Sequence, residues 1–300
     1  MPVSRKPVEV IAPKARDTGA ARRVAKLVAR IGGVGAADAD ADAPRLEGKI
    51  GRVSLIGCGP GDVELMTVKA VRAIMAADVI LTDDLIADDV LDLGRPGAAR
   101  IRVGKRGGRA SCHQDDINAL MVRLASQGRH VARLKSGDPM LFGRAGEEIA
   151  ACAAAGVAVE VVPGISAAFG LAARLKVSLT HRDHAQSVRF VTGHARTGAL
   201  PDDLDWAGLA HARTTLVVYM GARTAPDLAK GLIGAGRAAT TPVVVAVGIA
   251  RADESFAAMT LGDLVELPAA AIDGPVLIGI GEVFSTVPAS VASLIEVAGA

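Results

Sequence analysis

Short runs of Val, Ile and Leu alternate with longer amphipathic stretches from Gly51 onward. Continuous apolar runs predict strands that are buried on both faces, and the stretches between them predict helices. The expected strands are 52–57, 78–82, 99–103, 130–134 and 157–162, and the expected helices are 63–77, 85–92, 114–127, 144–155 and 165–175. This order of strand, helix and strand is typical of a parallel α/β sheet that helices cover on both sides.

A second series of the same kind follows Pro163. Its expected strands are 187–193, 214–220, 242–248 and 275–281, with a short strand near Phe256 and helices at 223–235 and 260–267. We expect the strands of this half to run in mixed directions. The predicted fold class is α/β, with an N-terminal α/β domain over 50–178 and a C-terminal α/β domain over 179–300.

The first fifty residues follow a different pattern. Residues 18–31 predict one short basic helix, and Gly32 to Pro44 is a low-complexity stretch that is typical of a flexible linker. Residues 1–49 are therefore expected to form a flexible basic tail and an Ala/Asp linker. A basic helix that docks on a partner is the alternative.

Composition limits the classes of function. Half of the 300 residues are apolar, so a sizeable core is available. The five Phe, one Trp and one Tyr leave almost no material for stacking nucleobases, and a formal net charge of +2 does not favour a polyanion. The sequence therefore predicts no nucleic-acid partner.

Other sequence features bear on compartment and metal chemistry. The longest apolar run, Pro242 to Ala250, is too short to span a bilayer, and the N-terminus lacks the apolar stretch of a secretory signal. Three widely spaced Cys with no CxxC pair fit reduced thiols better than disulfides or a zinc site. HExxH and GxSxG are absent. These features predict a cytoplasmic protein with no membrane partner and no metal site.

Three glycine-containing loops each follow a predicted strand of the first half. They are GCGPGD (57–62), LKSGDPMLFG (134–143) and VVPGIS (161–166). Glycine lets the backbone approach a ligand closely, and ligands of open α/β sheets bind at the carboxyl ends of the strands. We expect the three loops to converge on one small ligand.

The first loop also has part of a dinucleotide fingerprint, because Asp83 follows at the end of the second strand. Asp62, however, stands where a third small residue belongs and would place negative charge near a pyrophosphate. An NAD(P)-dependent oxidoreductase is therefore kept as an alternative. A tight turn with Asp62 as helix N-cap accounts for that residue equally well.

Charged side chains gather in further loops. Cationic residues cluster in VGKRGGR (103–109) and in LTHRDHAQSVRF (179–190). Such runs are most often solvated surface, but Arg pairs with carboxylates in a fork-like geometry, so the clusters indicate a carboxylate-rich substrate. Asp83 and Asp84 follow the strand 78–82; one is expected to cap the helix 85–92, and the other is a candidate general acid or base.

Taken in order, the motifs GCGPGD, DVILTDDLI, VGKR, RLKSGDPMLFGRAGEE, VVPGIS, LTHRDHAQSVRFVTGH and TLVVYMG resemble the tetrapyrrole methyltransferases. The likeness covers about residues 50–285. The chain is most similar to the branch of the family that acts on uroporphyrinogen III. The resemblance implies two α/β domains with the active site in the cleft between them, and usually a homodimer. It also implies C-methylation of uroporphyrinogen III at C2 and C7, a step of sirohaem and cobalamin biosynthesis. The methyl donor would be S-adenosyl-L-methionine, and the products precorrin-2 and S-adenosyl-L-homocysteine.

Carried over position by position, the resemblance assigns roles to individual residues. Catalysis falls to Asp83, with Lys105 as its partner. The implied cofactor-binding residues are Pro60, Ser136, Gly137, Asp138, Leu141, Ser166, Ala167 and Met220. Suitable partners for the substrate carboxylates are Arg106, Arg109, His181 and Arg182.

The chain departs from the family pattern at three places. Ser136 replaces a Gly, Asp84 replaces an Arg beside Asp83, and 247–249 lacks the usual Glu/Asn-Gly-Thr turn. Ser136 requires a backbone that tolerates a Cβ, and Asp84 removes a cation beside the expected base. A non-catalytic tetrapyrrole-binding protein is therefore a second alternative.

Overall fold

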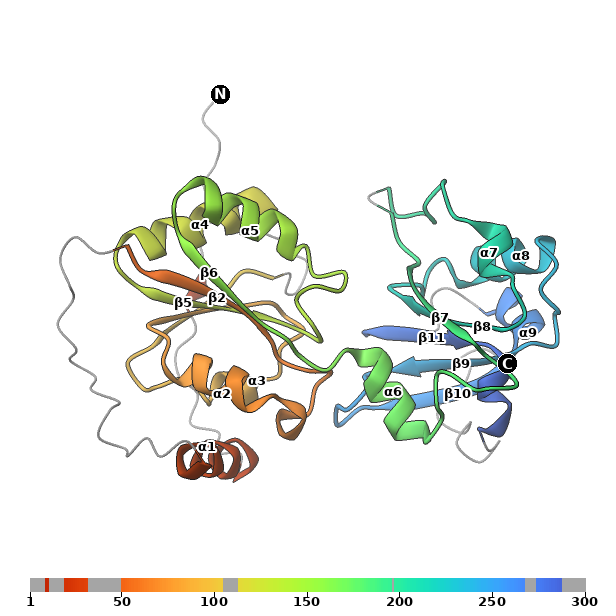
Figure 1. Cartoon of the computed structure of the whole chain (residues 1–300), viewed down its shortest axis with the longest axis horizontal. Coiled ribbons are helices and arrows are strands. Elements are labelled where there is room, and N and C mark those ends of the chain that lie inside the picture. Colours follow the sequence, from red (N-terminus) through yellow and green to blue (C-terminus); the bar gives the residue numbers. More distant parts are fainter. Residues whose placement is uncertain are drawn as a thin grey trace. The chain divides into compact units, whose positions relative to one another are not determined.

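The chain folds into two α/β units (Figure 1). A computed structural model describes residues 9–10, 19–31, 50–104, 113–195, 197–267 and 274–287. Contacts divide the chain into Met1–Ser166 and Ala167–Ala300. Each unit has its own sheet, so the predicted fold class is confirmed. The expected boundary between 178 and 179 stays a prediction.

Among the described residues, the first unit holds a six-stranded sheet with the order β1-β4-β3-β5-β2-β6. Its strands are β1 (Glu9–Val10), β2 (Arg52–Gly57), β3 (Val79–Thr82), β4 (Ala99–Arg102), β5 (His130–Lys135) and β6 (Ala158–Val162). The strands pair in parallel, except that β1 runs antiparallel to β4. The loops that follow β2 to β6 therefore leave the sheet at one common edge, its carboxyl edge.

Helices cover both faces of this sheet. They are η1 (Val63–Leu65), α2 (Val68–Met75), α3 (Asp88–Leu91), α4 (Gln114–Ser126) and α5 (Ala145–Ala154). Helices α2 and α3 lie on one face, and α4 and α5 on the other (Figure 1). Along β2, Val53 and Leu55 join the core under α4 and α5, whereas Ile56 joins the core under α2 and α3. Burial on both faces explains why the strands are continuous apolar runs.

Two helix expectations differ from the structure. The helix expected over 63–77 is divided, because Met66 and Thr67 are extended; Asp62 caps η1 and Thr67 caps α2. The prediction that Asp83 or Asp84 caps the next helix is wrong. Helix α3 starts later, and its N-cap is Ala87, which offers no side-chain hydrogen bond.

The basic helix expected near the N-terminus is present as α1 (Gly19–Ile31). It packs against η1, α2 and α3, with Ala21 and Val28 buried in the same core. Most of the remaining residues of 1–49 lie outside the described ranges, so the flexible tail stays a prediction for them.

The second unit holds, within the described ranges, a five-stranded sheet with the order β10-β9-β11-β8-β7. Its strands are β7 (Ser187–Thr192), β8 (Thr214–Tyr219), β9 (Pro242–Val247), β10 (Ser255–Thr260) and β11 (Val276–Ile280). Strands β7 and β8 are parallel and the other pairs antiparallel, which confirms the expected mixture of directions. Its helices are α6 (Ala167–Leu175), α7 (Trp206–Leu209), α8 (Ala225–Gly234), α9 (Leu261–Val265) and η3 (Glu282–Thr286).

A close approach in this unit gives a stability prediction. A Cβ on Gly231 of α8 would lie 2.2 Å from the ring of Trp206, whereas a Cβ on Gly234 of the same helix meets nothing within 4 Å. We expect Gly231→Ala to cost about 1–3 kcal/mol through overpacking, despite the gain in helix propensity. Gly234→Ala is the matched control and keeps or raises stability. Trp206 is the one Trp of the chain, so its fluorescence during thermal unfolding measures both effects. Equal midpoints for the two variants would contradict the packing argument.

Candidate functional site

The glycine-containing loops after β2 and β5 are joined through their backbones. The N–H of Gly59 donates to the carbonyl of Gly137 (3.2 Å), and the N–H of Gly137 donates to the carbonyl of Gly59 (2.7 Å). The N–H of Cys58 donates to the carbonyl of Lys135 (2.9 Å). The first two loops therefore form one structure at the carboxyl edge.

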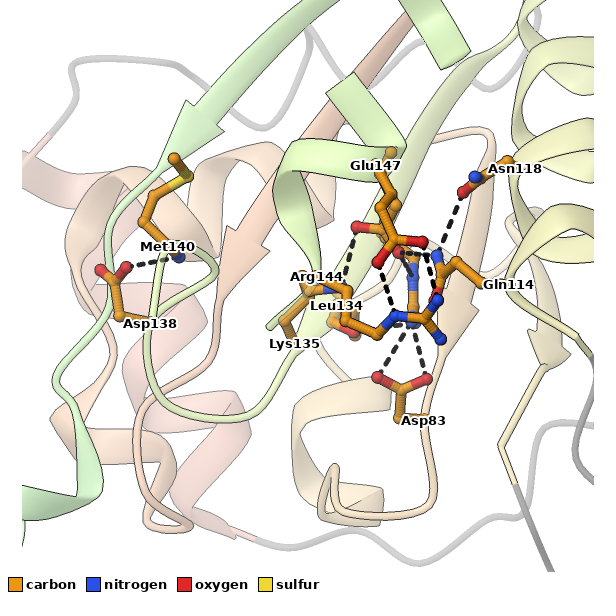
Figure 2. A network of polar contacts seen from close by, with 11 residues as sticks. Asp83, Gln114, Asn118, Leu134, Lys135, Asp138, Met140, Arg144 and Glu147 are labelled. Atoms are coloured by element: carbon orange, nitrogen blue, oxygen red, sulfur yellow. Dashed lines mark hydrogen bonds and ion pairs between the residues drawn. The ribbon is translucent and has the colours of Figure 1, made fainter. Parts of the chain in front are cut away.

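The loop after β6 packs directly onto this pair. A Cβ on Gly57 would lie 2.5 Å from the N of Gly164 and 2.8 Å from the carbonyl oxygen of Gly137. Asp138 adds a side-chain link: its Oδ2 accepts from the N–H of Gly164 (3.0 Å), and its Oδ1 accepts from the N–H of Met140 (2.8 Å), a contact drawn in Figure 2. The three loops therefore meet, and their convergence on one small ligand stays a prediction.

Backbone conformation explains which loop positions need glycine. Gly59 and Gly137 have φ of 74° and 68°, a region that L side chains seldom adopt. Ser136 is not in that region, so its Cβ is tolerated there. Phe142 (φ 53°) and Arg144 (φ 54°) are non-glycine residues held in the left-handed region. Such strain collects at functional sites.

The expected cofactor residues lie in both units. Pro60, Ser136, Gly137, Asp138, Leu141 and Ser166 belong to the three joined loops of the first unit. In the second unit, Ala167 starts α6, and Met220 follows β8 with φ 58° and a side chain that is largely exposed. Their contacts with a cofactor stay predictions.

The carboxylate of Asp83 stands after β3 at the same edge and is held by a buried arginine. Arg133 Nη2 donates to Asp83 Oδ1 (2.8 Å) and to Oδ2 (3.0 Å). The side chain of Arg133 is 3% exposed and that of Asp83 is 33% exposed. Arg133 thus places a cation beside Asp83, although Asp84 stands where the family pattern has an Arg.

The network continues into the core (Figure 2). Arg133 Nε donates to Glu148 Oε1 (3.0 Å), and Lys135 Nζ donates to Glu148 Oε2 (2.8 Å). Gln114 Nε2 also donates to Glu148 Oε1 (3.2 Å). Burial lowers the pKa of Lys135, and the charge of Arg133 adds to that effect. Burial also opposes the charge of Arg133, but Asp83 and Glu148 outweigh it and raise the pKa of Arg133.

Sequence reasoning missed these buried charges because 130–134 was interpreted as an apolar strand. Arg133 and Lys135 are two apart in β5, so they point to the same face of the sheet. Glu148 lies among the buried residues of α5. Two cations at that spacing inside an otherwise apolar strand were the available signal.

Asp84 does not share this network in the described contacts. Arg102 Nη1 lies 3.6 Å from Asp84 Oδ1, and Arg102 Nη2 lies 3.5 Å from Asp88 Oδ1. The expected site residues Lys105, Arg106 and Arg109 lie outside the described residues. Gly104, the last described residue before them, lies beside Asp84.

The remaining expected substrate residues form a short turn in the second unit. His181 and Ala185 exchange backbone hydrogen bonds of 2.8 and 2.9 Å. Thr180, His181, Arg182, Ala185 and Gln186 line a hollow there. The exposed ring of His184 lies 4.6 Å from that of His181, centroid to centroid. The turn therefore presents His181 and Arg182 together.

The turn at 247–249 departs from the family pattern, and it is closed by a carboxylate. Gly248 and Ala250 have φ of 62° and 58°. Glu254 Oε2 accepts from the N–H of Ala250 (2.6 Å), and Glu254 Oε1 accepts from Arg174 (2.7 Å). The departure is thus built into a defined turn.

Within the ranges that the structure describes, no three His, Cys, Asp or Glu side chains are grouped so as to hold a metal ion. No helix in those ranges is long and apolar enough to cross a membrane.

Joined loops at the carboxyl edge of a parallel sheet lie where α/β proteins bind their ligands. The sequence model of the family described as Tetrapyrrole (Corrin/Porphyrin) Methylases matches residues 52–265. The chain belongs to this family.

Individual relatives agree with that assignment. The chain is 51% identical over 237 residues to siroheme synthase 1 of Serratia proteamaculans, a match that covers 79% of this chain and 49% of that protein. It thus spans about half the length of the curated relatives it matches.

Solved structures match over a larger share of their own length. The uroporphyrin-III C-methyl transferase from Thermus thermophilus complexed with S-adenyl homocysteine is 37% identical, with a TM-score of 0.67, covering 78% of this chain and 98% of that one. The cobalt precorrin-4 methyltransferase CbiF is 29% identical, with a TM-score of 0.70, covering 78% of this chain and 96% of that one.

Proposed function

We propose that the chain is an S-adenosyl-L-methionine-dependent methyltransferase that methylates uroporphyrinogen III at C2 and C7 and gives precorrin-2. The observation that carries this proposal is the likeness to the Thermus thermophilus transferase with S-adenyl homocysteine, which extends over 98% of that chain. Precorrin-2 would serve sirohaem and cobalamin biosynthesis, and we place the reaction in the cytoplasm.

The three joined loops suit an adenosyl ligand. Their backbones are packed without side chains between them at Gly57, Gly137 and Gly164, and glycine lets the backbone approach a ligand closely. Ser136 and Ser166 add hydroxyls. The residues that would hold the cofactor are Pro60, Ser136, Gly137, Asp138, Leu141 and Ser166, with Ala167 and Met220 from the second unit. When bound, S-adenosyl-L-methionine supplies a methyl group that its sulfonium already activates.

The chain's own residues then position the substrate and accept a proton. Asp83 is the base that takes the proton released at the methylated ring, directly or through water, with Lys105 as its partner. Both carboxylate oxygens of Asp83 face Arg133, so the group is set in one orientation. Holding two reactants in place is itself a large part of catalysis.

The substrate is rich in carboxylates, and cations are its natural partners. Arg106, Arg109, His181 and Arg182 take this role. The family resemblance also supports a homodimer as the working form of the enzyme.

One assay tests the function. Purified protein is incubated with methyl-labelled S-adenosyl-L-methionine and uroporphyrinogen III under anaerobic conditions, and the product is analysed by mass. We expect two labelled methyl groups per macrocycle and one S-adenosyl-L-homocysteine for each methyl group transferred. Binding of uroporphyrinogen III without label transfer would support the non-catalytic alternative. Calorimetric binding of NAD(P) in preference to S-adenosyl-L-homocysteine would support the oxidoreductase.

A further inference from the structure

The buried charges of the first unit form a costly arrangement. Arg133, Lys135 and Glu148 have side chains that are at most 5% exposed. Removing such charges from water costs several kcal/mol per ion, and apolar residues of similar size often serve stability equally well. Stability alone therefore does not account for them. The network reaches the surface at Asp83, whose side chain is one-third exposed.

We propose that Arg133, anchored by Glu148, is a positioning residue that holds the Asp83 carboxylate oriented for proton removal. The inference rests on the proposed function, in which Asp83 is the base.

The guanidinium of Arg133 is fixed from three directions. Nη2 donates to both oxygens of Asp83, Nε donates to Glu148 Oε1, and Nη1 donates to the carbonyl of Leu134 (3.1 Å). A planar group bonded at all three nitrogens cannot turn without breaking a contact. The orientation of the Asp83 carboxylate is therefore set by Arg133 of β5 and not by the loop after β3 that carries Asp83.

Glu148 is fixed in turn. Its Oε2 accepts from Lys135 and its Oε1 accepts from Gln114 at the start of α4, in addition to Arg133. Gln114 Nε2 also donates to Asn118 Oδ1 (3.1 Å). Residues of α4 and α5 thus fix Glu148, and Glu148 fixes Arg133 of β5 near the carboxyl edge.

Other charged groups surround Asp83. Lys135 lies on the same strand as Arg133, and its charge interacts with that of Asp83. On the β4 side, Arg102 is engaged by Asp84 and Asp88. From β2, burial raises the pKa of the Cys58 thiol to about 12, so this group stays neutral. The direct hydrogen bonds from Arg133 make it the cation with the strongest hold on the carboxylate.

The test compares Arg133→Gln, Asp83→Asn and the double variant. Loss of its hydrogen bonds leaves the Asp83 carboxylate free to turn, so we expect Arg133→Gln to lower kcat and to leave the KM for uroporphyrinogen III unchanged. We expect kcat at neutral pH to fall about 10-fold, with the Kd for S-adenosyl-L-homocysteine unchanged. If Arg133 acts through Asp83, the double variant is no slower than Asp83→Asn alone.

The matched control is Arg100→Gln. Arg100 is also a buried arginine of this unit, but its Nε and Nη2 donate to the backbone carbonyls of Leu91 (3.1 Å) and Gly94 (3.2 Å). Its substitution also removes a buried guanidinium, but the hydrogen bonds given for Arg100 orient no carboxylate. The kcat of Arg100→Gln is expected to match that of the unsubstituted protein.

Each remaining result is decisive. A full multiplicative loss in the double variant shows that Arg133 serves the fold, and it overturns the inference while leaving the proposed function intact. An unchanged kcat in Asp83→Asn removes Asp83 as base, which is a failure of the proposed function.

If Arg133→Gln does not bind S-adenosyl-L-homocysteine, Arg133→Lys decides. Lysine keeps a cation facing Asp83 but lacks the planar fork, so kcat must fall while the Kd for S-adenosyl-L-homocysteine stays unchanged. An unchanged kcat, or loss of binding in this variant too, overturns the inference.

Discussion

Asp83→Asn is expected to lower kcat by about 100-fold or more, the range that a positioned general base contributes. The amide keeps the size of the side chain but cannot accept the proton. Asp83 follows β3 and is held by Arg133, apart from the hydrogen bonds that join the three glycine-containing loops. The Kd for S-adenosyl-L-homocysteine should therefore change by less than about twofold, since one hydrogen-bond change at a distance has little effect on binding.

Steady-state methylation of uroporphyrinogen III and calorimetric titration of S-adenosyl-L-homocysteine measure the two quantities. Asp88→Asn is the matched control, because Asp88 is an exposed carboxylate of α3 whose described contact is a 3.5 Å pair with Arg102. It is expected to keep its activity. A kcat for Asp83→Asn equal to that of Asp88→Asn would exclude Asp83 from the reaction.

Gly57→Ala is expected to abolish measurable cofactor binding. The new Cβ would lie 2.5 Å from the N and 2.7 Å from the Cα of Gly164, both backbone atoms that cannot rotate away. The loops after β2 and β6 must then separate, and the backbone edge that they form with Gly137 opens. Overpacking of this kind costs about 1–3 kcal/mol, so a lower melting temperature is expected as well.

Gly146→Ala provides the comparison. Gly146 lies in α5 of the same unit, and a Cβ there meets nothing within 4 Å. This variant should bind S-adenosyl-L-homocysteine normally and melt at the same or a slightly higher temperature. Normal binding by Gly57→Ala would mean that the three-loop contact is not needed for the cofactor.

The strands and the gathering of the loops could be predicted because they depend on strong local signals. Strands buried on both faces leave continuous apolar runs, and parallel strands bring the loops after them to one edge. The confirmed mixture of directions in the second sheet was a less direct inference, since periodicity carries no information on strand direction.

The wrong expectations for the helices also have physical causes. The cap assigned to Asp83 or Asp84 was wrong because Asp83 is engaged by Arg133, fifty positions along the chain, and α3 begins only after Ala87. The break between η1 and α2 was missed because Thr67 fits a helical pattern as well as a cap. The two cations of β5 are visible in the sequence, but periodicity does not show which residue pairs with them, so the contact with Glu148 could be found only in three dimensions.

The pairing of β1 with β4 has a practical consequence. The family match begins at Arg52, so β1 lies upstream of it, yet Glu9 and Val10 pair with Ile101 and Arg102 of β4. Without that short strand, β4 would present open N–H and C=O groups, which recruit other chains and promote aggregation. Strand β1 thus covers part of the outer edge of β4, and a variant without Glu9 and Val10 would expose that edge to pairing with other chains.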